Sequence, residues 1–136
     1  MNYEELLRTH HLKVTPQRLG IMSLMYKAGH ISVEDLFVEM KKEFSSISLA
    51  TLYKNITAML ESALIKEIKV PNMKAKYEIK KAPHAHLLCQ GCNEFIDLSI
   101  DINSIVQEAS QKSHYELLDS SIVLCGYCAS CQEKSA

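Results

Sequence analysis

Hydrophobic side chains recur every three or four residues along three segments in the first half of the chain, and this period predicts three helices. The first helix begins at Thr15 as N-cap, with Pro16 at its first position, and ends at Gly29. The second and third helices begin at Ser32 and Ser48, a residue type that commonly caps a helix N-terminus. The hydrophobic positions predicted to face the core are Leu19, Ile21, Met22, Leu24 and Met25 in the first helix, Leu36, Val38, Met40 and Phe44 in the second, and Leu52, Ile56, Met59 and Leu60 in the third.

Alternating hydrophobic and polar residues predict strands in the rest of the chain. Residues 64–70 and 75–81 form two such segments around the turn 71–74, which predicts a hairpin. Residues 82–89 and 94–100 predict a second hairpin, and residues 120–125 a further strand. Three helices followed by a hairpin are the order of a winged helix. The pattern therefore predicts an α+β fold that begins with a winged-helix domain.

Charge is distributed unevenly between the two halves of the chain, although the net charge of the whole is only −1. Residues 1–80 contain 12 Lys and Arg against 9 Asp and Glu, a balance of +3, whereas residues 81–136 contain 3 against 7, a balance of −4. The change coincides with a shift from a Lys-rich to a Cys- and His-rich sequence. We therefore predict a domain boundary near residue 80, with a basic domain over 1–80 and a small acidic domain over 81–136.

The composition is that of a globular protein. Hydrophobic residues make up 47% of the chain and charged residues 23%. No apolar run approaches the roughly 18 residues that a membrane span needs, and residues 1–11 are polar and acidic, unlike a signal peptide. We therefore expect a cytoplasmic protein with no membrane partner. In that compartment the five cysteines are expected to hold metal or to take part in redox chemistry, and not to form disulfides.

The third predicted helix has the properties of a helix that reads DNA. In a helix-turn-helix protein the N-terminal part of this helix lies in the major groove and contacts bases. Its exposed side chains here suit the thymine methyl group, phosphate and adenine, and two polar residues at the start of the first helix are placed to meet phosphates. The alternative is a solvated polar face, and a winged helix can also serve protein contacts. The candidate DNA-binding residues are Gln17, Arg18, Ala50, Thr51, Tyr53, Lys54 and Asn55.

Two Cys-x-x-Cys pairs predict a structural zinc site. Cys89 and Cys92 are separated by 35 residues from Cys128 and Cys131, and four thiolates close a tetrahedral site with no open position for chemistry. Such a site would fasten the end of the chain to its middle and stabilise a domain whose core is small. Cys125 makes the ligand set ambiguous, because spacing alone does not decide which two of the last three cysteines bind the metal. The ordinary role of a cysteine at the end of an apolar strand is that of a buried structural thiol. A disulfide or a redox-active dithiol is the alternative.

Two histidines beside the first cysteine pair predict a second metal site with different chemistry. His84 and His86 lie two residues apart in a predicted strand, so their side chains point to the same face. Antiparallel pairing through a turn centred near residue 91 places Asp97 opposite them. Two imidazoles and a carboxylate suit Fe(II), Mn(II) or Zn(II) better than a metal that prefers thiolates. A pair of surface histidines without a metal is the alternative.

Four motifs, in this order, resemble the ferric uptake regulator (Fur) superfamily of dimeric, metal-dependent bacterial repressors. They are TPQR from residue 15, SLATLYKNI from residue 48, HAHLLCQGC from residue 84 followed by IDL, and CGYCASC from residue 125. The resemblance extends from about residue 12 to residue 131. It implies a winged-helix DNA-binding domain over 1–80, an α/β dimerisation domain with a four-cysteine zinc site over 81–136, a homodimer, and a double-stranded DNA operator as partner, with no small organic substrate.

The resemblance also implies the ligands of two metals. It assigns structural Zn(II) to Cys89, Cys92, Cys128 and Cys131. It assigns a regulatory Fe(II) or Mn(II) to His30, Glu78, His84, His86 and Asp97. In this family the ligand at position 30 ties the DNA-binding domain to the dimerisation domain, so that metal binding selects one domain arrangement.

Three features favour the peroxide-responsive (PerR) branch of this superfamily over the iron-sensing branch. Asp97 stands where iron sensors usually have Glu, the HAH triplet has no acidic residue between its histidines, and Ser120 supplies no further histidine. Glu78 departs from the branch, in which Asp is commoner at that position. We therefore expect a repressor that releases the operators of oxidative-stress genes when Fe(II) and peroxide oxidise His30 or His84, whereas Mn(II) leaves it bound.

Four other functions are compatible with these residues. An iron-sensing Fur repressor of iron-uptake genes would use the same ligands, as would a zinc or manganese sensor. A metalloenzyme could hold its metal in the His and carboxylate set, although no general base is evident beyond the ligands themselves and no HExxH pattern is present. A thiol switch at the Cys-x-x-Cys pairs would lose zinc before any histidine is oxidised. Of these classes we expect a regulator and not an enzyme.

Overall fold

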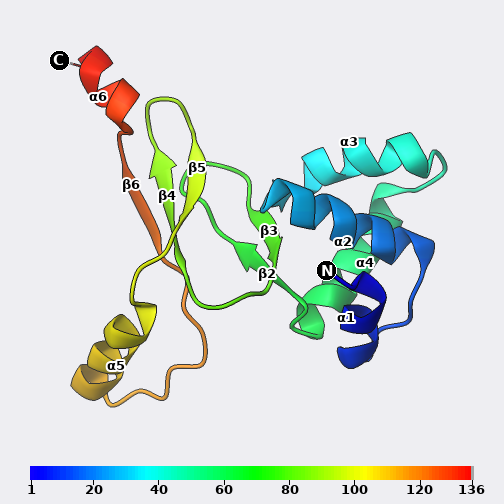
Figure 1. Ribbon diagram of the computed structural model, residues 1–136, viewed down its shortest axis with the longest axis horizontal. Coiled ribbons are helices and arrows are strands. Elements are labelled where there is room, and N and C mark those ends of the chain that lie inside the picture. Colours follow the sequence, from blue (N-terminus) through cyan, green and yellow to red (C-terminus); the bar gives the residue numbers. More distant parts are fainter. Residues whose placement is uncertain (136) are drawn as a thin grey trace. The chain divides into compact units, whose positions relative to one another are not determined.

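The structure, a computed structural model, describes residues 1–135, and its chain divides into two compact units between Lys80 and Lys81 (Figure 1). The elements of the first unit are α1 (Tyr3–Thr9), α2 (Pro16–Ala28), β1 (Ile31–Ser32), α3 (Val33–Glu43), α4 (Leu49–Glu61), β2 (Ile65–Ile68) and β3 (Lys76–Ile79). The elements of the second unit are β4 (Ala85–Cys89), β5 (Phe95–Leu98), α5 (Ile102–Ser113), β6 (Val123–Gly126) and α6 (Ala129–Ser135). Within the described residues, every helix is too short or too polar to cross a lipid bilayer.

Side-chain caps fix the starts of the three predicted helices, α2, α3 and α4. The side-chain oxygens of Thr15, Ser32 and Ser48 each accept a hydrogen bond from the backbone N–H three residues further on, at 3.1–3.2 Å. Each bond satisfies a donor that the first turn of a helix leaves unpaired. The predicted starts of the three helices are confirmed.

The helices of the first unit enclose one hydrophobic core. Most of the predicted core positions are buried there, namely Ile21, Met22, Met25, Leu36, Met40, Leu52, Ile56 and Met59. Four more, Leu19, Leu24, Phe44 and Leu60, are partly buried against it. Val38 was predicted wrongly, since its side chain is 58% exposed. It lies two residues from both Leu36 and Met40, and this spacing places it on the opposite side of α3.

A three-stranded antiparallel sheet in the order β1-β3-β2 completes the first unit. Strands β2 and β3 are the predicted hairpin, with Ile65 opposite Ile79. The two-residue strand β1, which was not predicted, adds Ile31 opposite Tyr77. Helices α2, α3 and α4 followed by this sheet form a winged helix, as predicted.

The second unit is built on a three-stranded sheet in the order β5-β4-β6. Strands β4 and β5 form the second predicted hairpin, in which His86 lies opposite Asp97. Strand β6 runs parallel to β4, with Cys89 opposite Gly126, and α5 lies in the long connection that a parallel pair requires. Helices α1, α5 and α6 were not predicted. The α+β fold class is confirmed.

Candidate metal centres and nucleic-acid face

Four cysteine sulfurs of the second unit lie close together. Cys89 ends β4, Cys92 lies in the following turn, and Cys128 and Cys131 lie just before and within α6. The parallel pairing of β4 with β6 brings these two parts of the chain together. All four Sγ atoms lie within 4.8 Å of one another, and Cys92 Sγ is 3.9 Å from Cys128 Sγ. Thiolates bound to one Zn(II) at about 2.3 Å would be about 3.8 Å apart, so the arrangement fits a tetrahedral zinc ion.

Hydrogen bonds give these thiols very different acidities. The backbone N–H of Cys128 donates to Cys89 Sγ at 3.3 Å, and this bond, together with the N–H of Cys92, lowers the pKa of Cys89 to about 6. Hydrogen bonding with the sulfurs of Cys128 and Cys89 raises the pKa of Cys131 to about 12. One thiolate therefore forms readily, but further negative charge on the same four sulfurs is unfavourable. A dication that neutralises this charge is what such a donor set requires.

The close approach of the β4–β5 turn to α6 depends on Gly91. A Cβ atom at this position would lie 2.7 Å from Cys131 Sγ and 3.0 Å from Cys131 Cβ. Both distances are shorter than an ordinary van der Waals contact, so a side chain here would displace the cysteine. This glycine was not singled out from the sequence, where its signal is its place between two paired cysteines.

Cys125 lies outside the four-sulfur cluster. It is exposed on β6, opposite Leu88 of β4. The expectation of a buried structural thiol was wrong, since the described residues that pack around β6 leave this side chain exposed.

A second cluster of ligand atoms lies where β4 and β5 pair. His86 Nε2 is 3.2 Å from Asp97 Oδ1. His84 Nε2 is 3.1 Å from His86 Nε2 and 3.7 Å from Asp97 Oδ1. Ligand atoms about 2.1 Å from one metal ion are separated by about 3.0–3.4 Å. The structure thus brings together three of the predicted regulatory ligands at separations that fit a metal ion.

The two imidazoles are oriented by their surroundings. His84 Nδ1 lies 3.0 Å from the carbonyl oxygen of Ala82, so Nδ1 carries the proton and Nε2 presents its lone pair. The ring of His86 is buried and stacks on Phe95, with centroids 4.9 Å apart and an interplanar angle of 7°. Both Nε2 atoms therefore face the same point without a large loss of side-chain entropy when a metal binds.

The Asp97 carboxylate is shared between these imidazoles and a lysine. Oδ1 faces the two Nε2 atoms, while Oδ2 accepts a hydrogen bond from Lys81 Nζ at 2.6 Å. Partial burial by itself would raise the pKa of Asp97, but the Lys81 ammonium, followed by His84 and His86, outweighs burial and holds the pKa below its ordinary value. Asp97 is therefore an anionic donor at neutral pH. Lys81 was not singled out from the sequence.

The other two predicted regulatory ligands belong to the first unit. His30 lies between α2 and β1, and Glu78 lies on β3 with only 2% of its surface exposed. The antiparallel register pairs Ile31 with Tyr77, so one further step of the same register sets position 30 opposite position 78. A carboxylate buried to this degree is normally paired or bound to a metal. Their membership of the regulatory ligand set stays a prediction from the family resemblance.

The predicted DNA-binding residues lie on α2 and α4 of the first unit. Ala50, Tyr53 and Lys54 are exposed, whereas Gln17, Arg18, Thr51 and Asn55 are half-buried. Arg18 Nε donates to Asn55 Oδ1 at 3.0 Å, and Asn55 Nδ2 donates to the carbonyl oxygen of Thr51 at 3.1 Å. Both ends of the Asn55 amide are thus engaged within the unit. This favours a positioning role, holding α2 against α4, over the expected adenine contact.

Two further lysines that were not predicted lie in the β2–β3 hairpin, and one of them, Lys74, lines a small pocket together with Tyr53 of α4. Lys69 and Lys74 are exposed in the loop that joins β2 and β3. Lys74 Nζ lies 3.6 Å from Glu34 Oε1 at the start of α3, and this ion pair connects the loop to the helices. A basic hairpin loop beside α4 is suited to phosphate contacts.

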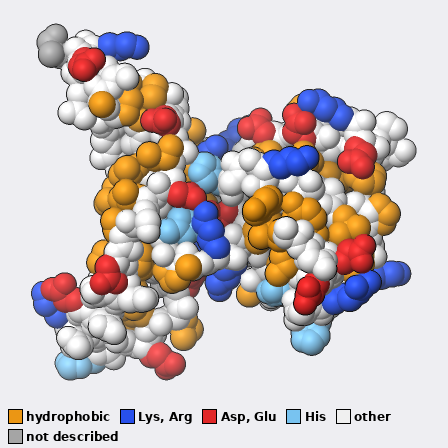
Figure 2. All heavy atoms as spheres, viewed as in Figure 1, with side chains coloured by type: hydrophobic (Ala, Val, Ile, Leu, Met, Phe, Trp, Pro, Cys, Tyr) orange, Lys and Arg blue, Asp and Glu red, His pale blue; other side chains and the backbone are white. Residues whose placement is uncertain are grey.

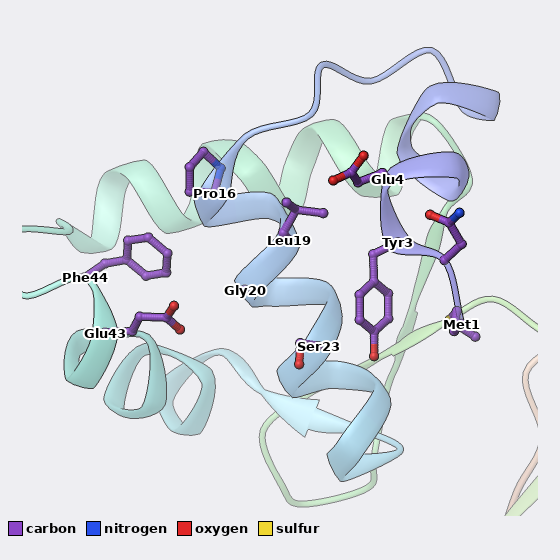
Figure 3. Close-up of a pocket in the computed structure, with 10 residues that line it drawn as sticks. Met1, Tyr3, Glu4, Pro16, Leu19, Gly20, Ser23, Glu43 and Phe44 are labelled. Carbon is purple, nitrogen blue, oxygen red and sulfur yellow. The ribbon is translucent and has the colours of Figure 1, made fainter.

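A groove elsewhere in the first unit carries acidic side chains, in contrast to the basic β2–β3 loop (Figure 3). It has a volume of about 1070 Å³ and lies between α1, the start of α2 and the end of α3. Its lining combines Tyr3, Leu19 and Phe44 with the carboxylates of Glu4 and Glu43. Carboxylates repel phosphate, so the charge of this groove does not favour contact with nucleic acid.

Comparison with known proteins identifies the family to which this chain belongs. The model of the ferric uptake regulator family matches residues 9–125. The chain is 24% identical over 132 residues to the peroxide operon regulator of Bacillus subtilis, covering 96% of this chain and 91% of that protein. It is 32% identical over 126 residues to the ferric uptake regulation protein of Synechococcus elongatus, covering 88% of this chain and 86% of that protein. The crystal structure of the Campylobacter jejuni peroxide stress regulator has a TM-score of 0.77 and 33% identity, covering 96% of this chain and all of that one. Because the family match covers most of its length, the chain belongs to the ferric uptake regulator family of metal-responsive transcriptional regulators.

Proposed function

We propose that this chain is a dimeric, metal-dependent repressor that senses peroxide. The observation that carries the proposal is the convergence of two imidazole Nε2 atoms and one Asp97 oxygen within 3.7 Å, in a set without thiolates. Nitrogen and oxygen donors suit Fe(II) and Mn(II), whereas the four clustered thiolates suit Zn(II). The regulatory ion would be held by His30, Glu78, His84, His86 and Asp97.

The ligands themselves are the proposed target of peroxide. Bound Fe(II) would supply the redox chemistry that splits the O–O bond of peroxide within reach of its ligands. The net change is one oxygen atom added to an imidazole carbon of His30 or His84. The ring loses two electrons, and the peroxide that accepts them leaves its second oxygen as water. The oxidised ring is a poorer donor, so the metal is lost and with it the form of the protein that binds DNA.

DNA recognition is proposed for α4 and the β2–β3 loop. Thr51, Tyr53 and Lys54 would meet bases and phosphates in the major groove, and Lys69 and Lys74 would meet phosphates beside it. A homodimer would present two copies of α4 to the two half-sites of an operator. Because a bacterial operator lies in the cytoplasm, this function places the protein there.

Exposed hydrophobic side chains on the second unit support the homodimer. Ile96 of β5, Leu124 of β6 and Tyr127 after β6 are each 43–54% exposed. Figure 2 shows hydrophobic side chains gathered over β6. Clustered apolar surface of this kind commonly marks a protein interface.

An iron-sensing repressor is the second candidate, and the 32% identity to a ferric uptake regulation protein favours it. One experiment separates the two. The protein is loaded anaerobically with Fe(II), exposed briefly to low peroxide and analysed by peptide mass spectrometry, with an Mn(II)-loaded sample as control. One added oxygen on the peptide of His30 or His84, in the iron sample only, supports peroxide sensing. Unmodified histidines together with iron-dependent operator binding would instead support the iron sensor.

A further inference from the structure

We propose that Lys81 sets the metal affinity of the centre formed by His84, His86 and Asp97, because its ammonium competes with the metal for the Asp97 carboxylate. The inference rests on the proposed metal-binding function of these three residues. It assigns to Lys81 a positioning and affinity-setting role, not that of a ligand.

The contact between Lys81 and Asp97 differs from the helical ion pairs of the protein. Lys81 Nζ lies 2.6 Å from Asp97 Oδ2, and the two residues are 16 positions apart, one before β4 and the other on β5. By contrast, Lys112 pairs with Glu108 one turn away on the same helix. A local helical pair forms wherever the spacing allows it, whereas the contact with Asp97 depends on the β4–β5 register that also builds the metal centre.

The two oxygens of Asp97 face different groups. Oδ1 lies 3.2 Å from His86 Nε2 and 3.7 Å from His84 Nε2, and Oδ2 is bonded to the ammonium. A metal ion held by Oδ1 would therefore compete with the Lys81 ammonium for the single negative charge of the Asp97 carboxylate. The ammonium reduces the donor strength of the carboxylate and keeps Oδ2 from acting as a second donor. Both effects weaken metal binding.

The size of the effect is limited by solvent. The side chains of Lys81 and Asp97 are 52% and 37% exposed, so water screens the repulsion between the ammonium and a dication. Removal of the Lys81 charge should therefore tighten metal binding about ten-fold, which corresponds to about 1.4 kcal/mol. The same exposure means that the difference should shrink as the salt concentration rises.

The test compares Mn(II) binding to the full-length, zinc-containing protein and its variants. Mn(II) is used because it favours nitrogen and oxygen donors over the thiolate cluster. The concentration of free Mn(II) during the titration is followed by its electron paramagnetic resonance signal. Lys81→Met should bind Mn(II) about ten-fold more tightly than the wild type. Lys81→Arg, which keeps the charge, should stay close to the wild type. Lys112→Met removes an equal charge from a lysine paired elsewhere and should also stay close to the wild type.

Each other outcome overturns a defined part of the reasoning. An unchanged affinity in Lys81→Met would show that the ion pair has no influence on the centre, and a weaker affinity would show that Lys81 only orients Asp97. Equal tightening in Lys81→Arg or Lys112→Met would rule out competition by this particular charge. If Asp97→Asn leaves Mn(II) binding at the wild-type level, the proposed metal centre itself is wrong, and the role of Lys81 falls with it.

Discussion

Replacing Gly91 tests how the four-cysteine site is assembled. Gly91→Ala places a methyl group 2.7 Å from Cys131 Sγ and 3.0 Å from Cys131 Cβ, where ordinary contacts begin at 3.4 Å. Relief of the shorter contact requires a movement of about 0.7 Å, whereas metal–ligand distances tolerate only about 0.2 Å. Cys131 is buried and cannot simply rotate into solvent. We therefore expect a loss of about 1–3 kcal/mol in the free energy of unfolding, together with weaker zinc binding.

The measurements are zinc retention against a competing chelator and thermal unfolding of the zinc-loaded protein. For a domain of this size the melting temperature should fall by roughly 4–8 °C per kcal/mol lost. Gly126→Ala is the matched control, because among the described residues no heavy atom lies within 4 Å of a Cβ built there. If Gly91→Ala retains zinc and melts at the same temperature as the Gly126→Ala protein, the steric reasoning is refuted.

Three further predictions concern stability. Ala63 follows α4 with a φ of 62°, so Ala63→Gly should raise the free energy of unfolding in urea by roughly 0.5–1 kcal/mol, and a decrease would contradict this. Ser48→Ala removes the acceptor for the Thr51 N–H and should lower the same quantity by about 1 kcal/mol, whereas Ser48→Asp should recover most of it. Without the regulatory metal, Asp97 has a pKa below its ordinary 3.8, so it stabilises the folded state above about pH 4, and this contribution is lost as the pH falls through the lower folded-state value. Asp97→Asn should flatten the pH dependence of urea unfolding in that range, and an unchanged slope would disprove the assignment.

The separation of the two metal centres follows from ligand chemistry. Four thiolates fit a closed tetrahedral zinc site with no open position, whereas the imidazole and carboxylate set suits a more weakly held ion. The two centres are only a few residues apart along β4, yet they use opposite ends of the β4–β5 hairpin. In the proposed function, the thiolate site would keep its ion while the ion of the imidazole and carboxylate site exchanges.

The features predicted from the sequence are those encoded by neighbouring residues. A helix cap needs an acceptor three residues before a donor, so Thr15, Ser32 and Ser48 were recognisable as helix starts. Alternation along a strand placed His84 and His86 on one face. Val38 is exposed although it is hydrophobic, because the helical period turns it away from Leu36 and Met40, which are buried.

Contacts between distant segments were decided only by the tertiary structure. Arg18 donates a hydrogen bond to Asn55, which lies 37 positions further along the chain, and Lys81 donates one to Asp97, 16 positions further along. No sequence pattern predicts either contact. The exposure of Cys125 depends on what packs against β6, and the need for glycine at position 91 depends on where α6 lies. The sequence by itself thus determined which residue types and local elements are present. The pairing and register of strands far apart in the chain determined which of those side chains share a charge, a proton or a metal, because that choice is made by packing across the whole unit and not by spacing along the chain.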